Sequence, residues 1–309
     1  MAAEPTDPRG DMLVGPLVVR GERLVIGAPK DAGKSTLIAC LVRAAVNGDS
    51  FLGWQGVGGC RVLMVDVEQG PRALRRTVNA YGLGDTPNVD ILSVPGGLEL
   101  ARSDVDRRQL EEIVAEAAPD ILVLDPLYKA HLADTNDPLE GMRLMRTLDA
   151  LREGKNLALV MAAHCRKPPP GGRRRLSIDD ISGAGTLVYG AEVILGLEKV
   201  VYGRSVLHVW ADRLGGLGQE TSILMRFEHG RGFWRDVLRE DPERSTDIVA
   251  AVLAAVGSRG MTRAELAEAS GISVRTVARV LPTIARQKKR RNVAGAVLWC
   301  IRRDYGEDT

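Results

Sequence analysis

The sequence predicts an α/β fold built on a mainly parallel sheet, followed by a small helix-turn-helix domain. The first observation is an alternation of apolar, strand-like runs with amphipathic, helix-like segments over residues 12–237. Such alternation is typical of a parallel sheet covered by helices on both faces. The second is a phosphate-cradle motif in residues 26–36. The third is a change of pattern around residues 239–246, after which helical patterns predominate.

The expected elements follow one another from the cradle onward. Strands are expected at RLVIGA (23–28), RVLMVDV (61–67), DILSV (90–94), DILVLD (120–125) and LALVMAAH (157–164). Helices are expected from Gly33, from GPRALRRTV (70–78), and over 104–117 and 141–154, where apolar residues recur at helical spacing. After residue 190 only strand-like runs remain, namely AEVILGLE, SVLHVWAD and SILMRFE. We expect these three runs to add antiparallel strands to one sheet edge.

Composition restricts the class of protein. The 309 residues suffice for one large and one small domain, and 45% hydrophobic with 27% charged residues is an ordinary globular composition. The N-terminal MAAEPTDPRGD lacks a basic segment followed by an apolar one, so we expect no signal peptide. The apolar runs are too short to cross a bilayer. Four scattered cysteines indicate reduced thiols, so we expect a cytoplasmic protein without a membrane partner.

The pattern divides the chain into four parts: a tail (1–11), the α/β domain (12–238), a linker (239–246) and a C-terminal domain (247–304). Residues 241–309 contain 12 Lys/Arg against 8 Asp/Glu, and a second basic stretch, CRKPPPGGRRR, covers 165–175. Two basic patches on a near-neutral chain favour a polyanion partner, although such runs are also common on ordinary solvated surfaces.

The loop after the first strand has the features of a phosphate cradle. Backbone N–H groups at the start of a helix bind phosphate oxygens, and the helix dipole favours the negative charge. Lys34 would reach the β- and γ-phosphates of ATP, and the Ser35 hydroxyl would bind Mg²⁺. Where the motif has its first glycine this chain has Ala28, which is acceptable if that residue needs no positive φ. The residues expected to contact the nucleotide are Ala28, Pro29, Lys30, Asp31, Ala32, Gly33, Lys34, Ser35 and Thr36.

Two further strands end in carboxylates. Asp125 follows four apolar residues and is the expected second Mg²⁺ ligand; a turn at Asp125-Pro126 is compatible with that role. Asp66 and Glu68 end an earlier strand and point to the same side, because side chains alternate along a strand. Ligands of such sheets bind at the carboxyl ends of the strands. Glu68 is therefore the candidate base that activates water, and a solvated strand-end acid is the alternative.

These motifs resemble a known family. GAPKDAGKSTLIACLVRAAVNGDSFLGW, RVLMVDVEQGPRALRRT, ILVLDPL and LVMAAHCRK resemble, in that order, the RecA-like P-loop ATPases of plasmid-type hexameric replicative helicases. The resemblance covers nearly all of residues 12–237. It implies that Glu68 activates water, that His164 senses the γ-phosphate, and that Arg213 reaches the site of a neighbouring subunit in a ring. The family often has a lysine two residues before that arginine, where this chain has Ala211.

The same resemblance implies a DNA-binding segment over residues 165–195. In this family the segment after the sensor lines the ring channel and grips single-stranded DNA. The basic residues of that segment here are Arg166, Lys167, Arg173, Arg174 and Arg175, on a stretch rich in proline and glycine. Their spacing suits contacts with a phosphate backbone, and the arginine run has no aromatic residue that would stack on bases.

The C-terminal segment MTRAELAEASGISVRTVARVLPTI has a helix-turn-helix pattern. Thr262 and Glu265 have capping-box spacing, and Ser273 is a good N-cap for a second helix. The following KKRRNVAGAVLW would form a basic β-wing, so the whole resembles a winged-helix domain that binds duplex DNA. The expected DNA contacts are Arg275, Arg279, Lys288, Lys289, Arg290 and Arg291. Pro282 is expected to kink or end the second helix.

Three functions agree with these patterns. The leading hypothesis is a hexameric, ATP-driven helicase that moves along single-stranded DNA. The second is an ATP-dependent recombinase or loader that remodels DNA without unwinding it. The third is a DNA-binding regulator in which ATP only switches assembly; the C-terminal domain favours it, whereas Glu68 and Arg213 favour real ATP turnover.

Overall fold

The computed structural model describes residues 11–84, 86–127, 138–166, 176–182, 188, 190–199, 204–217, 222–228, 232–235, 249–250, 252–253, 261–270, 272, 274–291 and 297–301. The chain divides into two compact units, one formed by Met1–Lys199 with Val206–Arg235 and the other by Val200–Ser205 with Asp236–Thr309. No helix among the described residues combines the length and the apolar character needed to cross a bilayer.

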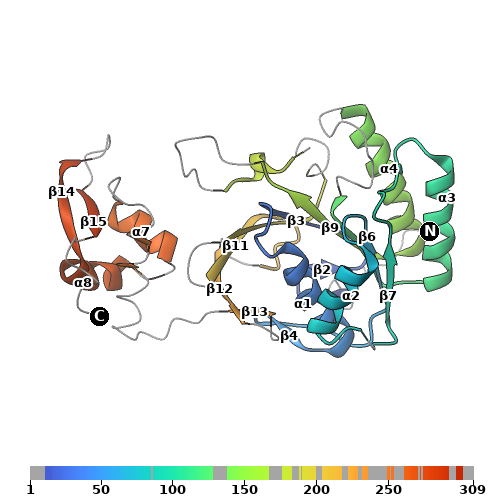
Figure 1. Ribbon diagram of the computed structural model, residues 1–309, viewed down its shortest axis with the longest axis horizontal. Coiled ribbons are helices and arrows are strands. Elements are labelled where there is room, and N and C mark those ends of the chain that lie inside the picture. Colours follow the sequence, from blue (N-terminus) through green and yellow to red (C-terminus); the bar gives the residue numbers. More distant parts are fainter. Residues whose placement is uncertain are drawn as a thin grey trace. The chain divides into compact units, whose positions relative to one another are not determined.

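The first unit is built on one large sheet (Figure 1). Its strands are β3 (Arg23–Ala28), β6 (Val62–Asp66), β7 (Val89–Ser93), β8 (Ile121–Asp125), β9 (Ala158–His164), β10 (Val193–Lys199), β11 (Arg204–Asp212), β12 (Ser222–Glu228) and β13 (Gly232–Arg235). They lie in the order β13-β12-β11-β10-β3-β9-β8-β6-β7. The helices are α1 (Lys34–Asn47), α2 (Pro71–Ala80), α3 (Asp104–Ala117) and α4 (Pro138–Lys155), with a 3₁₀ turn, η2 (Ile178–Asp180). Two small hairpins pair β1 (Met12–Val14) with β2 (Val18–Val19) and β4 (Ser50–Phe51) with β5 (Trp54–Gln55).

Six strands of this sheet, from β10 to β7, are parallel to their neighbours. Their carboxyl ends therefore share one edge, which we term the carboxyl edge, and their amino ends share the opposite amino edge. The strand alternation expected from sequence is present, but its orientation differs at one point. The run AEVILGLE forms β10, which pairs parallel with β3 instead of antiparallel. On that side of the sheet, β12 pairs antiparallel with β13.

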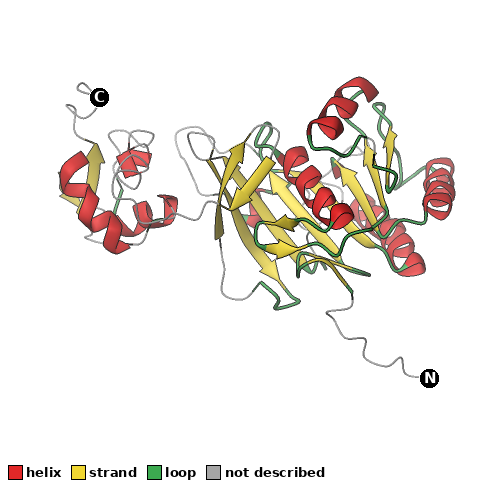
Figure 2. Ribbon diagram, turned by 90° about the horizontal axis from the view of Figure 1, so that it is seen from below, coloured by secondary structure: helices red, strands yellow, loops and turns green. Residues whose placement is uncertain are grey.

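Helices cover both faces of the sheet (Figure 2). The strand side chains alternate between two cores. On β3, Leu24 and Ile26 belong to one core and Val25 to the other, as the two-residue period of a strand requires. The first core includes α1 and α2, through residues such as Leu37 and Val78. The second includes α3 and α4, through residues such as Leu110 and Leu148. Because both faces are covered, strands such as Ile121–Asp125 are buried throughout.

The second unit has its own apolar core and contains α7 (Arg263–Ser270), α8 (Val274–Ile284), β14 (Ala285–Arg291) and β15 (Val297–Ile301). The two strands pair antiparallel. The helix α8 ends at Ile284, two residues after Pro282, and β14 begins at once. This agrees with the missing N–H of proline, which removes one helical hydrogen bond. The predicted N-cap Ser273 lies outside the described residues.

Candidate nucleotide-binding site

The phosphate loop joins β3 to α1 at the carboxyl edge. Asp31 has φ 62°, and Gly33, the N-cap of α1, has φ 97°, a backbone conformation that favours glycine. No side chain caps this helix, so the N–H groups of its first turn remain available to an anion. The loop therefore presents backbone donors and the positive end of the helix dipole to phosphate oxygens. Lys30 and Asp31 are exposed, whereas Ala28 and Ala32 are buried.

Ala28 fits the position where the motif has glycine. It ends β3, pairs with His164 of β9, and is not among the residues with a positive φ. The preceding residue, Gly27, is the one that packing restricts. A Cβ added to Gly27 would lie 2.8 Å from Cγ1 of Ile181 and 3.2 Å from Sγ of Cys165. Glycine is thus required one residue before Ala28, for close packing rather than for backbone freedom.

Asp125 at the end of β8 meets the first two residues of α1. The Ser35 hydroxyl donates a hydrogen bond of 2.6 Å to Oδ2 of Asp125. Nζ of Lys34 lies 4.0 Å from Oδ1 of the same carboxylate, and the side chains of both residues are largely buried. A hydroxyl and one carboxylate are ligands that Mg²⁺ accepts, because it keeps several waters and the phosphate oxygens of its substrate. Ser35 and Asp125 therefore fit a Mg²⁺ ion, and Lys34 fits the phosphates.

Asp66 holds the segment that carries Glu68. Its buried carboxylate accepts hydrogen bonds from the N–H groups of Glu68 (3.0 Å) and Gln69 (2.6 Å), and from Nε2 of Gln69 (3.1 Å). Burial raises the pKa of Asp66, and the nearby Asp125 carboxylate raises it further. Sequence analysis placed Asp66 beside Glu68 but gave it no role. Aspartate side chains often accept hydrogen bonds from backbone N–H groups two or three residues later, which forms a turn. An aspartate at the end of a strand is the sequence signal for this arrangement.

Glu68 and His164 face each other across the site. Oε2 of Glu68 is 3.7 Å from Nε2 of His164, and the Glu68 side chain is 42% exposed, so it can reach solvent. Burial and the charge of Lys34 lower the pKa of His164, against the opposing effect of Glu68 and Asp125. His164 is therefore neutral at pH 7. The structure brings the predicted base and the predicted sensor together at the carboxyl edge.

Two aromatic residues that sequence analysis did not select lie against the phosphate loop. The hydroxyl of Tyr81 donates to Oγ1 of Thr36 over 3.3 Å. A Cβ added to Gly33 would lie 2.9 Å from Cζ of Phe233, which belongs to β13 at the far edge of the sheet. Residues distant in sequence thus enclose the start of α1. No local motif marks them, because Tyr81 is positioned by the end of α2 and Phe233 by the last strand of the sheet.

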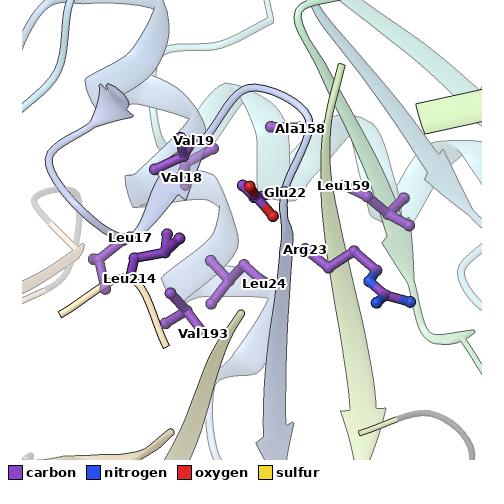
Figure 3. Close-up of a pocket in the computed structure, with 10 residues that line it drawn as sticks. All are labelled: Leu17, Val18, Val19, Glu22, Arg23, Leu24, Ala158, Leu159, Val193 and Leu214. Carbon is purple, nitrogen blue, oxygen red and sulfur yellow. The ribbon is translucent and has the colours of Figure 1, made fainter. Parts of the chain in front are cut away.

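Arg213 lies at the amino edge, away from the phosphate loop. Its N–H bonds to the carbonyl of Glu192 (2.9 Å), the residue that precedes β10. The next residue, Leu214, lines a pocket with Leu24, Ala158 and Val193, which stand at or near the first residues of β3, β9 and β10 (Figure 3). Because the six residues of β3 span roughly 17 Å, the backbone of Arg213 lies about one strand length from the phosphate loop of its own chain. The Arg213 side chain is exposed.

The predicted DNA contacts are placed only in part. Arg166 is exposed at the carboxyl edge, where its N–H bonds to the carbonyl of Asp180 (2.6 Å). Arg275 and Arg279 are exposed on α8, one helical turn apart. The remaining predictions, Lys167, Arg173, Arg174 and Arg175, lie outside the described residues. Lys288, Lys289, Arg290 and Arg291 belong to β14, in which the backbone alone is described.

A phosphate loop at the carboxyl edge, a Ser–Asp pair suited to Mg²⁺ and a strand-end glutamate define a RecA-like P-loop ATPase. The family profile described as an AAA domain matches residues 2–170, more than half of the chain, and the chain belongs to that family. The crystal structure of the flagellar accessory protein FlaH from Methanocaldococcus jannaschii is similar in fold, with a TM-score of 0.50 at 12% sequence identity. That match covers 71% of this chain and 90% of FlaH. No curated protein sequence matches the chain.

Proposed function

We propose that this ATPase is a ring-forming helicase that moves along single-stranded DNA, with a hexamer as the expected assembly. The observation that supports it best is the position of Arg213. This exposed arginine stands at the amino edge, a strand length from the phosphate loop of its own chain. An arginine that stabilises the charge of a transferred phosphoryl group must lie at the phosphates. Arg213 meets that requirement only at the site of a second copy.

The residues of the site divide the chemistry among them. Ser35 and Asp125 are the residues that would hold Mg²⁺, which would neutralise charge on the phosphate oxygens. Lys34 and the N–H groups of α1 orient the phosphates. Glu68 is placed to accept the proton of the attacking water at Oε2, because its side chain reaches solvent and its backbone is fixed by Asp66. His164, beside Glu68, is placed to respond to the γ-phosphate.

Exposed basic residues support DNA as the polymer. Arg166 lies two residues after His164, the last residue of β9, so a contact there would be close to the nucleotide site. Arg275 and Arg279 present two guanidinium groups on the same face of α8, as the second helix of a helix-turn-helix domain does toward duplex DNA. We therefore propose that the second unit is a winged-helix domain that binds duplex DNA.

A strand-displacement assay on a forked duplex tests the proposal, with wild type and Lys34→Ala compared. We expect ATP-dependent displacement and DNA-stimulated hydrolysis by wild type, and neither by Lys34→Ala. Glu68→Ala should lose hydrolysis by about a hundredfold or more and keep ATP binding, as expected for removal of a general base. DNA-stimulated turnover by wild type without displacement would contradict the helicase assignment and favour the loader or the regulator.

A further inference from the structure

An open depression lies between α3 and α4, outside the nucleotide site. It has about 780 Å³ of space, including its solvent-facing part, and it is lined by Ala101, Arg102, Arg107, Arg143, Arg146 and Thr147. Four of the six lining residues are arginines, two near the start of α3 and two on α4, and the two helices lie side by side in Figure 1. No large apolar side chain lines it. Nothing in the proposed ATPase chemistry uses these residues.

Three of the arginines are held in place. The carboxylate of Glu140, whose side chain is 6% exposed, lies 3.1 Å from Nε of Arg102 and 3.2 Å from Nη1 of Arg143. Arg107 donates to the carbonyl of Leu100 (3.0 Å) and pairs with Asp104. The side chains of Arg102 and Arg143 are 57% and 61% exposed, so these contacts orient the guanidinium groups and leave them open to a ligand. Groups that are already oriented lose less side-chain entropy on binding than free ones do.

The charge of the depression remains positive. Two carboxylates, Glu140 and Asp104, oppose four guanidinium groups. Arg146 is exposed and pairs with no carboxylate in the described part of the chain. Guanidinium groups bind phosphate oxygens through paired N–H donors, and this geometry suits phosphate better than a single ammonium group does. An open shape lets a polymer pass, whereas a small anion is usually enclosed.

The place of the depression in the fold also suits a polymer that reaches the nucleotide site. The helices α3 and α4 follow β7 and β8, whose carboxyl ends lie at the same edge as the phosphate loop. Exposed apolar residues on the same helices, Val105, Leu139 and Met142, do not line the depression. An apolar lining would favour a protein partner. The depression is lined mainly by arginines instead, which favours a phosphate-bearing partner.

We propose that the depression between α3 and α4 binds backbone phosphates of single-stranded nucleic acid. The choice of this polymer rests on the proposed function, whereas the affinity for phosphate rests on the arginines themselves. The site would add a contact beyond the basic segment that follows His164.

Binding of a fluorescent oligothymidylate, measured as a function of salt, tests this assignment. Arg146→Glu should weaken binding about five- to tenfold, and Arg146→Ala should reduce the slope of log affinity against log salt by about 0.7, the loss expected for one contact to a single strand. Arg76→Glu is the matched control, because Arg76 is also exposed but lies on α2, against the other face of the sheet. The control should bind like wild type.

Arg146→Glu that binds oligothymidylate like wild type would overturn the site. So would Arg146-dependent binding of polyglutamate without binding of oligothymidylate, which would indicate an acidic protein segment. In a Lys34→Ala background, binding of pyrophosphate but not of oligothymidylate, if it depended on Arg146, would indicate a site for small free phosphates. That result would equally overturn the proposal. The helicase assay separates the two claims. Arg146-dependent binding without strand displacement would leave this site standing and remove the helicase function.

Discussion

At the scale of single residues, the buried Asp66 holds the segment that carries Glu68. Its carboxylate accepts hydrogen bonds from two backbone N–H groups and one side-chain amide, which fixes the segment carrying Glu68. Small displacements of a reacting group can reduce the rate strongly. Asp66 is therefore a positioning residue, and its effect should appear in kcat rather than in nucleotide affinity.

Replacement of Asp66 by alanine tests this role. We expect Asp66→Ala to lower kcat for ATP hydrolysis about tenfold or more, because Glu68 loses its fixed position. Nucleotide affinity, measured by titration with a fluorescent ATP analogue, should stay within about twofold of wild type. Asp66→Asn keeps an oxygen acceptor for the two N–H groups and should recover part of the loss. An unchanged kcat in Asp66→Ala would show that Glu68 is positioned without it.

His164 leads to a prediction about pH. Because burial and Lys34 lower its pKa below the ordinary value of 6.5, the unfolded chain binds more protons than the folded chain as pH falls through about 6.5. The contribution of neutral His164 to stability is thus present above that pH and lost below it. Urea unfolding between pH 8 and pH 5.5 should show a larger loss of free energy of unfolding in wild type than in His164→Gln. Equal losses in both proteins would contradict this assignment.

Sequence patterns predicted some of these residues for a definite reason. Asp125 ends β8, Glu68 follows the end of β6, and Lys34 and Ser35 begin the helix after β3. In a parallel sheet, ligands bind at the edge where the carboxyl ends of the strands meet. The contact of Phe233 with Gly33 had no such signal. This contact depends on the curl of the sheet, which brings its last strand back against α1. The spacing of apolar residues, every two in a strand or every 3.6 in a helix, contains no information about that curl.

At the scale of elements, the helix α7 has the capping box that its sequence predicts. The N–H of Thr262 bonds to Oε2 of Glu265 (2.7 Å), and the N–H of Glu265 bonds to Oγ1 of Thr262 (3.2 Å). Reciprocal bonds of this kind satisfy two donors that a helix start otherwise leaves free. The start of the helix is therefore set by local chemistry, which is why the sequence alone could locate it.

Removal of the capping hydroxyl should weaken α7. We expect Thr262→Ala to lower the free energy of unfolding by about 1 kcal/mol. Thr262→Ser should lower it much less, because serine keeps the hydroxyl that accepts the hydrogen bond. Amide hydrogen exchange over residues 263–270 would report the difference as faster exchange in the alanine variant. Equal protection in the alanine and serine variants would mean that tertiary packing, not the cap, holds the first turn.

The orientation of β10 could not be predicted in the same way. Its apolar run is compatible with either direction, and the pattern after residue 190 contained no crossover helix to indicate a parallel strand. The structure places β10 directly beside β3 and parallel to it. The direction of β10 depends on the sheet edge at which residues 165–192 deliver the chain. The path of that segment decides the direction, and the sequence of the strand does not.

At the scale of the whole molecule, the separation of Arg213 from the phosphate loop concerns assembly. Each interface of a head-to-tail ring would combine Glu68 of one copy with Arg213 of the next. In a random equal mixture of Arg213→Ala and Glu68→Ala proteins, about a quarter of interfaces would contain both intact groups. We expect ATP hydrolysis to return to about that fraction of the wild-type rate.

A second mixture is the control for this prediction. Lys34 and Glu68 belong to the same side of the interface, so Lys34→Ala mixed with Glu68→Ala can form no intact site. Steady-state hydrolysis should rise in the first mixture and stay at background in the second. Verified mixed rings without any rise in the first mixture would contradict the role of Arg213 across the boundary.

The position of β9 between β3 and β8 has a consequence for how the site can vary. Neighbouring strands lie about 4.8 Å apart, so the sheet can widen or narrow the gap between the phosphate loop and Asp125 only in steps of that size. Finer adjustment is left to side-chain length. One methylene more at position 125 would move the carboxylate relative to Ser35 and Lys34 without any shift of the backbone, so aspartate and glutamate are not equivalent there. The sheet order sets the coarse scale of the gap, and the choice of acid sets the fine scale.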